Sequence, residues 1–344
     1  MAARRIRRSL RILMWVAGGL SLVAAALLYF LYAPAPPEPP LSARLELKTI
    51  RIGALERRYL VYAPARRAAG APLIVVFHGS MGSPAKIRVE TGYEFDRLAD
   101  RHGFVVAYPA GHEGNWNDCR KAADYAARRL DIDDLGFFEA MVSQLQRQRG
   151  VDPERVFVAG LSSGGQFALR LALERPDRIA GAALFGASLP TPDNSVCAAR
   201  PPSPPIMFVN GTSDPINPYE GGTVSMFGFA SRGSVRSAID SARHFAGTRT
   251  AAVPAIARLR PSGRGDGTWV ERSVWRTPGR SEVVLLTVHG GGHVVPQPVY
   301  RPPRLLGRAT TAINGPSEAW EFFRRQPRRP ARLARAAAEP PRRD

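Results

Sequence analysis

The chain has 344 residues, of which 44% are hydrophobic and 8% aromatic, so it can bury one large core or at most two small ones. Its formal net charge is +19, but five arginines lie within residues 1–11 and eight more follow residue 323, which leaves no concentrated basic stripe between them. No nucleic-acid recognition motif accompanies this charge, and we expect no specific nucleic-acid binding.

The N-terminal segment has the pattern of a membrane anchor. Residues 12–32, ILMWVAGGLSLVAAALLYFLY, carry no charge and can cross a bilayer as a helix. The arginines before this run, and their absence after it until Arg44, predict a cytoplasmic N-terminus and an extracytoplasmic body, periplasmic or at the cell surface. We interpret residues 1–32 as an uncleaved anchor, because Pro36 would follow a cut after the small residues at 33–35. The alternative is a cleaved signal, of which the twin-arginine-like RRSLR at 7–11 is one form, and the protein would then be secreted.

The rest of the chain divides by composition. Residues 33–40, APAPPEPP, predict a stiff linker, and residues 41–325 predict the folded domain. The Arg/Pro/Ala-rich residues 326–344 predict a disordered tail. Cys119 and Cys197 lie in the exported part, where we expect a disulfide, with two buried thiols as the alternative.

Within the body, apolar runs alternate with helical patterns. Near-continuous apolar runs, typical of strands buried on both faces of a parallel sheet, lie at 73–77, 104–108, 156–159, 206–209 and 283–288. Helical patterns lie at 86–101, 134–149, 164–174, 234–245 and 317–325. The alternation predicts an α/β fold with helices on both faces of a mostly parallel sheet, and residues 44–53 and 57–64 predict an antiparallel hairpin before it.

Residues 160–164, GLSSG, carry the strongest chemical signal. They follow a predicted strand and open a predicted helix, the context in which G-x-S-x-G forms a nucleophile elbow around Ser162. A serine nucleophile needs a histidine base oriented by a carboxylate. Asp214 follows the strand at 206–209, and His293 follows the strand at 283–288 and three glycines. These three residues are the predicted catalytic set.

Two other side chains compete for these roles. His289 lies nearer to the end of its strand than His293, and we expect it to be structural because the glycines at 290–292 let His293 turn back over the sheet edge. Asp266 lies in a Gly/Arg loop that follows no predicted strand, which favours Asp214 as the acid.

Backbone N–H groups near Ser162 are candidates for an oxyanion hole. One belongs to Ser163 at the start of the helix, and the other to Ser80 or Met81 in the H-G-x-x-G sequence at 78–82. We interpret His78 as organising that loop and not as a second base.

These motifs resemble the polyhydroxybutyrate depolymerase and feruloyl esterase group of the α/β-hydrolase superfamily. The resemblance covers about residues 41–325 and lies in separate blocks: FHGSMG, GNWND, DDLGF, VDPERVFVAGLSSGG, NGTSDPINPYEGG and GGGHVVP. It implies an α/β-hydrolase fold and the same set of Ser162, Asp214 and His293.

The resemblance also directs attention to residues around the site. The family often has an aromatic residue between the histidine and the next proline, but here Val294 and Val295 stand there, which predicts an altered acyl-pocket wall. Trp116 is a candidate for lining the substrate cleft, with core packing as the alternative. Four further polar residues of these blocks are interpreted as bracing loops: Asn117, Asp118, Asp133 and Asp134.

The residues therefore predict an extracytoplasmic serine esterase that acts through an acyl-enzyme on hydroxyalkanoate-oligomer, feruloyl or acetyl esters. A serine peptidase on the same fold and a catalytically inactive, envelope-anchored binding module are the alternatives. The six histidines are scattered and the two cysteines lack ligand spacing, so we expect no metal and no other cofactor. The expected partners are a small or oligomeric ester and, through the N-terminal helix, the membrane.

Overall fold

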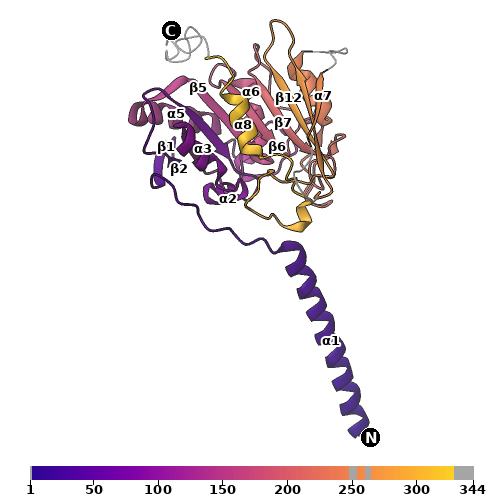
Figure 1. The fold of residues 1–344 in the computed structure, drawn as a ribbon. Coiled ribbons are helices and arrows are strands. Elements are labelled where there is room, and N and C mark those ends of the chain that lie inside the picture. The colour runs from indigo at the N-terminus through magenta and orange to yellow at the C-terminus, as the bar shows by residue number, and fades with distance from the viewer. Residues whose placement is uncertain (1, 248–253, 260–264, 329–344) are drawn as a thin grey trace.

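The body of the protein is built on one large sheet. The computed structural model describes residues 2–247, 254–259 and 265–328, with the backbone alone for residues 2–8. Ten strands form the sheet in the order β1-β2-β4-β3-β5-β6-β7-β12-β11-β10 (Figure 1). They are β1 (Glu46–Ile52), β2 (Leu55–Tyr62), β3 (Ala71–Phe77), β4 (Val105–Pro109), β5 (Val151–Leu161), β6 (Gly181–Phe185), β7 (Ile206–Gly211), β10 (Ala255–Leu259), β11 (Trp269–Trp275) and β12 (Val283–His289).

The centre of the sheet is parallel and its two edges are antiparallel. Strands β4, β3, β5, β6, β7 and β12 pair in parallel, whereas β1 and β2 flank one side and β11 and β10 the other in antiparallel pairs. The predicted mostly parallel α/β sheet and the N-terminal hairpin are both confirmed. The carboxyl ends of the parallel strands therefore meet at one edge, where the motif loops follow β3, β5, β7 and β12.

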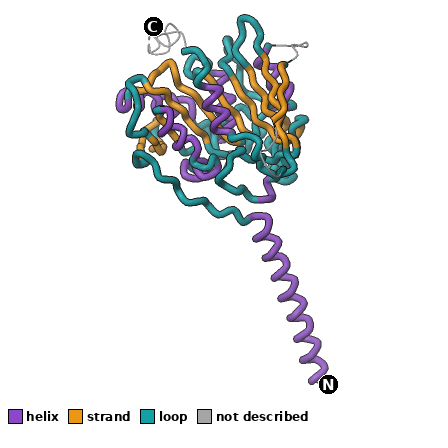
Figure 2. The backbone as a smooth tube through the Cα atoms, in the orientation of Figure 1, coloured by secondary structure: helices purple, strands orange, loops and turns teal. Residues whose placement is uncertain are grey.

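Helices cover both faces of this sheet (Figure 2). Alternate residues of β3 belong to different apolar clusters: Leu73 and Val75 pack with α5 and α6, and Ile74 and Val76 pack with α2, α3 and α8. The helices of the body are α2 (Pro84–Glu90), α3 (Glu94–His102), α4 (Ala126–Arg129), α5 (Asp134–Arg149), α6 (Ser163–Glu174), α7 (Ala238–Ala246) and α8 (Gly315–Phe323). Short elements complete the described part of the body: the 3₁₀ turns η1 (Pro192–Asn194) and η2 (Arg304–Leu306), and the strand pair β8 (Gly222–Thr223) and β9 (Ser234–Val235).

Some elements differ from their predicted form. The helix expected at 86–101 is two helices, α2 and α3, because Gly92 and Tyr93 between them have φ angles of +63° and +57°. The helix expected at 234–245 begins only at Ala238, where Ser237 accepts a hydrogen bond from the N–H of Asp240 as the N-cap. Strands β6, β10 and β11 were not expected. Of the tail predicted at residues 326–344, the part from residue 329 on lies outside the described residues.

Helix α1 (Ala2–Leu31) projects away from the body (Figure 1). Its segment Ser9–Leu31 has a mean hydropathy of 2.1 and is not buried by the rest of the protein, so it is long and apolar enough to cross a membrane. The linker between helix α1 and the body also makes contacts with the body. Glu38 forms an ion pair with the buried Arg88, and the backbone oxygen of Pro36 accepts a hydrogen bond from Tyr93 Oη.

The two cysteines form the expected disulfide. Cys119 and Cys197 are joined with their Cα atoms 5.2 Å apart, across a sequence separation of 78 residues. Next to the bond, Val196 N–H donates to the oxygen of Cys119 and Lys121 N–H donates to that of Asn194. The bridge therefore ties the loop after β4 to the segment after η1.

Candidate active site

Ser162 occupies a strained turn between β5 and α6. Its φ and ψ angles are 53° and −116°, a conformation that L-residues rarely adopt. A side chain at Gly160 would collide with the backbone of Gly164, and one at Gly164 would collide with the backbone at the end of β3. Both glycines are thus needed for the close packing that raises Ser162 at the carboxyl edge of the sheet.

Asp214 and His293 come together from loops after neighbouring strands. His293 Nδ1 donates to Asp214 Oδ2 at 2.7 Å, and both side chains are almost fully buried. The other carboxylate oxygen, Oδ1, accepts the N–H groups of Ile216 and Asn217, each at 2.8 Å. These bonds hold the carboxylate and place the proton on Nδ1, which leaves the Nε2 lone pair of His293 for another donor.

The glycines before His293 permit its loop to turn. The N–H of His293 donates to the oxygen of Leu306 at 2.7 Å, and that of Gly292 donates to Arg308 at 2.9 Å. A side chain at Gly292 would overlap the backbone of Leu306, and one at Gly211 would overlap that of Gly291. The loop therefore lies packed between the end of β7 and η2.

Gly186 brings the imidazole beside the serine turn. It follows β6, whose last residue, Phe185, accepts the N–H of Ser162 at 2.8 Å. A Cβ on Gly186 would lie 2.9 Å from His293 Nδ1 and 3.6 Å from Asp214 Oδ2. Ser162 Oγ forms no hydrogen bond with any residue that the structure describes, and in apo enzymes such bonds often tighten only when substrate binds.

His289 lies apart from this arrangement. Its ring stacks on that of Trp269 in the neighbouring strand, with centroids 3.6 Å apart and planes at 5°. Burial lowers the pKa of His289 below its usual value, which favours the neutral ring. Asp266 is also structural, since its oxygens accept hydrogen bonds from Thr268 and Thr311. Contrary to the sequence prediction, a strand (β10) does precede its loop.

The candidate oxyanion donors surround Ser162. Ser163 is the first residue of α6, so its N–H has no partner within the helix. The loop after β3 approaches from the other side, where a Cβ on Gly79 would lie 3.6 Å from Ser162 Cβ. Gly82 N–H donates to the oxygen of Gly79 at 3.1 Å, closing a turn around Ser80 and Met81 whose own N–H groups bind no described residue.

His78 holds the turn at residues 79–82 in place through its two ring nitrogens. It is fully buried, and its Nε2 accepts the N–H of Gly111 at 2.9 Å, which makes Nδ1 the donor to the oxygen of Gly79 at 2.8 Å. Burial lowers the pKa of His78 to about 4, so the ring stays neutral at physiological pH. This placement agrees with a loop-organising role.

Trp116 does not line a cleft. It is fully buried between Phe77 and Phe167, and its Nε1–H donates to the oxygen of His78 at 2.9 Å. The cleft role that we considered for it is therefore wrong, because its ring belongs to the core. The other polar residues of the same blocks make bracing contacts, as in the ion pair of Asp134 with Arg57 at 2.7 Å.

A small pocket opens beside His293. Val294 and Val295 line it, together with Glu90, Leu161, Tyr300, Pro302, Pro303 and Leu306, and their role as an acyl-pocket wall stays a prediction. The room in it is about 20 Å³, enough for about one water molecule. The walls are mostly apolar.

Glu90 was not anticipated from the sequence. Its side chain is 17% exposed, and its nearest cation is Lys86, with Nζ 3.9 Å from Oε1. Burial raises the pKa of Glu90 to about 7, although Lys86 and His293 oppose the shift. In the sequence it reads as one charge of a polar helix face, so only the tertiary structure shows it beside the histidine.

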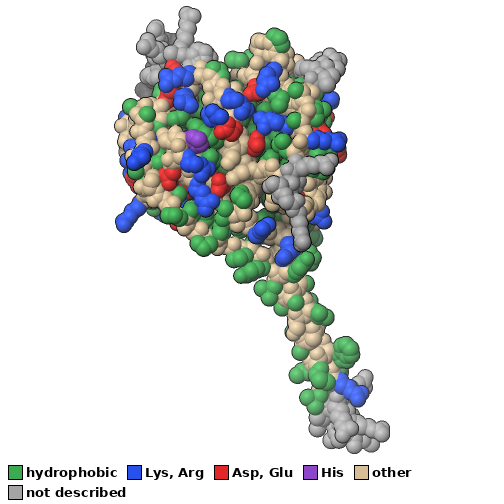
Figure 3. All heavy atoms as spheres, in the orientation of Figure 1, with side chains coloured by type: hydrophobic (Ala, Val, Ile, Leu, Met, Phe, Trp, Pro, Cys, Tyr) green, Lys and Arg blue, Asp and Glu red, His purple; other side chains and the backbone are tan. Residues whose placement is uncertain are grey.

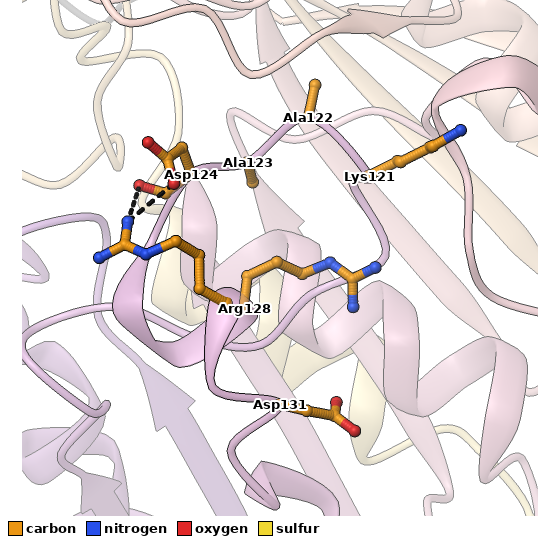
Figure 4. A pocket seen from close by; sticks show the side chains of 7 residues that line it. Lys121, Ala122, Ala123, Asp124, Arg128 and Asp131 are labelled. Carbon is orange, nitrogen blue, oxygen red and sulfur yellow. Dashed lines mark hydrogen bonds and ion pairs between the residues drawn. The ribbon is translucent and has the colours of Figure 1, made fainter.

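A second, polar hollow lies near residues 121–131 (Figure 4). Four of its charged side chains already have partners, since Asp124 pairs with Arg129 while Arg128 and Asp131 each bind the side chain of Asn117. It contains none of the candidate catalytic residues.

Comparison with known proteins gives one family. The family model described as "Esterase PHB depolymerase" matches residues 57–217. The chain is 30% identical to "Putative esterase NocK" of Nocardia uniformis subsp. tsuyamanensis over 82% of this chain and 86% of that protein.

Other relatives are matched over a smaller part of their length. The chain is 30% identical to "Feruloyl esterase B" of Piromyces equi and to "Poly(3-hydroxyalkanoate) depolymerase C" of Paucimonas lemoignei, over 44% and 36% of this chain. These matches span only 28% and 29% of the two relatives. Among solved structures, an acetyl xylan esterase from Aspergillus awamori superposes with a TM-score of 0.53 at 17% identity, covering 81% of this chain and 98% of that one, which shows a shared fold.

Proposed function

Because the chain belongs to the PHB depolymerase family of esterases and is thus a carboxylic-ester hydrolase, we propose that it is a membrane-anchored serine esterase with Ser162, Asp214 and His293 as its triad. The observation that supports the proposal is the buried His293–Asp214 pair, which contacts Gly186, the residue after the one that accepts the N–H of the strained Ser162.

The proposed reaction passes through an acyl-enzyme. Ser162 Oγ attacks the ester carbonyl while His293 Nε2 takes its proton, and the imidazolium is held by Asp214. The N–H groups of Ser163 and of Ser80 or Met81 stabilise the tetrahedral oxyanion. Collapse of this intermediate breaks the ester bond, and the alcohol leaves with the proton from His293. Water then attacks the acyl-enzyme with His293 again as base, which releases the acid and restores Ser162.

The pocket favours a short acyl group. With room for about one water molecule, it fits an acetyl methyl better than a feruloyl ring. We infer that acetyl and other short-chain esters are the better substrates.

We also propose that the catalytic body is extracytoplasmic. The support is the apolar helix α1 with arginines on its N-terminal side, and a disulfide of the kind that persists in oxidising compartments.

The test uses full-length protein in detergent. We expect it to hydrolyse p-nitrophenyl acetate faster than a feruloyl ester and to be labelled by a fluorophosphonate on the peptide that contains Ser162. Ser162→Ala should abolish both signals, whereas the exposed neighbour of the acid, Ser213→Ala, should keep them. A folded wild-type protein that shows neither hydrolysis nor labelling would contradict the proposal in favour of an inactive binding module.

A further inference from the structure

The end of the membrane helix packs on the segment that contains η2. Arg304 Nη1 donates to the backbone oxygen of Tyr29 at 3.0 Å, and its guanidinium carbon lies 4.3 Å from the centre of the Tyr29 ring. A pocket between the two is lined on the helix side by Tyr29, Phe30, Tyr32 and Pro34, and on the body side by Asp266, Arg301, Pro302, Arg304, Gly307, Arg308 and Ala309. The helix is thus joined to the body at one defined place, visible in Figure 1.

The same segment forms part of the candidate active site. Pro302, Pro303 and Leu306 line the pocket beside His293, and the oxygen of Leu306 accepts the N–H of His293. The catalytic pocket and the membrane helix therefore share one wall. The carboxyl edge of the sheet, where the site lies, is the edge of the body nearest to the end of the helix (Figure 1).

The aromatic residues at the end of the helix indicate how close the η2 segment lies to the bilayer. Tyrosine and tryptophan gather at the level of lipid headgroups, and the headgroup layer is about 5 to 7 Å thick on each side of the bilayer. Tyr29 and Tyr32 end the apolar span, so a segment in contact with Tyr29 lies at headgroup level.

The charges of this wall suit lipid phosphates. Arg301, Arg304 and Arg308 form no ion pair with any described residue, and Figure 3 shows Lys and Arg side chains where the helix meets the body. The one acid of the pocket lining, Asp266, is already bound by two threonines.

Apolar side chains are exposed in η2, in the candidate oxyanion loop and in the loop of Phe229. Leu305 in η2 is 40% exposed, Met81 in the candidate oxyanion loop 68%, and Phe229 77%. The loop of Phe229 lies close to η2, because Met226 of that loop and Leu306 of η2 pack on the same small apolar cluster. We call these three residues and the three arginines the membrane rim: Met81, Phe229, Arg301, Arg304, Leu305 and Arg308.

We propose that the membrane rim rests on an anionic phospholipid bilayer, so that the catalytic pocket opens at the lipid surface and takes esters held there. The arginines bind the phosphates, and the apolar side chains enter the headgroup layer. The proposal rests on the anchoring part of the proposed function and adds the orientation of the body and the physical state of its substrate.

Site-directed fluorescence tests the orientation. The two native cysteines are bridged, so Leu305→Cys or Phe229→Cys can be labelled with an environment-sensitive NBD dye in full-length protein. In vesicles of phosphatidylcholine and phosphatidylglycerol, we expect a blue-shifted emission that doxyl-labelled lipids quench. Pro278→Cys is the matched control, because this exposed residue precedes β12 at the opposite edge of the sheet. Equal, unquenched emission at all three positions would overturn the proposal.

Activity on a vesicle-embedded ester and on a soluble ester tests whether the enzyme takes its substrate from the lipid surface. Arg301→Gln with Arg308→Gln should reduce hydrolysis of an ester embedded in anionic vesicles by roughly fivefold for each arginine. Hydrolysis of soluble p-nitrophenyl acetate should stay unchanged, and Arg280→Gln at the far edge should alter neither rate. Equal loss on both substrates would overturn the proposal in favour of a structural role. Absence of soluble-ester activity in the wild type would instead refute the proposed function.

Discussion

At the scale of single residues, protonation and hydrogen bonding separate side chains that look alike in the sequence. His289 and His293 follow the same strand, but one stacks on Trp269 and the other donates to Asp214. His78, a third histidine near the site, is neutral and fully used in holding its loop. Of these three histidines, His293 is the one that pairs with a carboxylate and contacts Gly186, next to the turn of Ser162.

His293→Ala should reduce kcat to near the level of Ser162→Ala, a loss of several kcal/mol of transition-state stabilisation. The double variant should lose little more, because triad members act as a unit. His289→Ala should retain at least roughly a tenth of the rate and mainly reduce stability, since a lost ring contact costs about 1 kcal/mol. Steady-state kinetics with circular dichroism would check this, and inactivity of a folded His289→Ala with an active His293→Ala would reverse the assignment.

Glu90 predicts a pH-dependent contribution to catalysis. Above its pKa of about 7 the carboxylate favours the imidazolium that His293 becomes in the transition state. The ratio of kcat/KM between wild type and Glu90→Gln should therefore be near one at pH 5.5 and rise severalfold by pH 8.5. A ratio independent of pH would contradict this role.

The pH dependence of the unfolding temperature provides an independent check of the raised pKa of Glu90. Its pKa is raised in the folded state, so the folded protein binds the proton more tightly and loses stability as pH rises from about 4.5 to about 7. Glu90→Gln should then unfold at a higher temperature than wild type at pH 8 and at a similar temperature at pH 4.

At the scale of elements, a strand that the sequence does not predict supports the site directly. Strand β6 reads GAALF, whose small side chains and lack of β-branched residues do not predict a strand, yet it lies between β5 and β7. Its end binds the N–H of Ser162 and leads into Gly186 beside His293. The break between α2 and α3 also depends on a distant segment. A side chain at Gly92 would collide with Gln297, which lies in the loop after His293.

Gly186→Ala tests the close approach of β6 to the histidine. The added methyl would lie 2.9 Å from Nδ1, so the ring must move and activity should fall more than tenfold. Gly279→Ala is the matched control, because Gly279 also has positive φ (72°) but nothing within 4 Å of the added atom. Both variants should lose about 1 kcal/mol of stability, and equal activity of the two would refute the packing role.

At the scale of the whole molecule, helix α1, the linker and the body are joined by specific contacts. The net charge of +19 is concentrated towards the two ends of the chain. The linker contacts the body through Glu38 and Pro36, and the anchor contacts it through Tyr29. A cut within the linker therefore removes contacts as well as the candidate membrane span.

A fragment that begins at Ala33 should be soluble and folded, because it keeps Glu38 and Pro36 and every candidate catalytic residue. Its kcat/KM on p-nitrophenyl acetate should lie within about twofold of the full-length value, because α1 supplies no catalytic group. Hydrolysis of a vesicle-embedded ester should fall much further. An inactive or insoluble fragment, with active full-length protein in detergent, would show that the anchor belongs to the fold.

The sequence by itself determined the class of the sheet, the elbow around Ser162, the choice of Asp214 and His293, and the candidate membrane span. These features depend on local patterns: apolar runs, glycines at fixed offsets, and polar residues directly after strands. Helix α5 was predicted with its observed bounds, because its cap and its periodicity are both local.

Only the tertiary structure decided what depends on contacts between distant segments. It buried Trp116, formed β6, β10 and β11, split the helix at Gly92, and brought Glu90 to His293 and Arg304 to Tyr29. A short strand or a buried carboxylate is stabilised by neighbours far along the chain, and a charge on a helix face looks the same in sequence whether it meets water or a catalytic histidine.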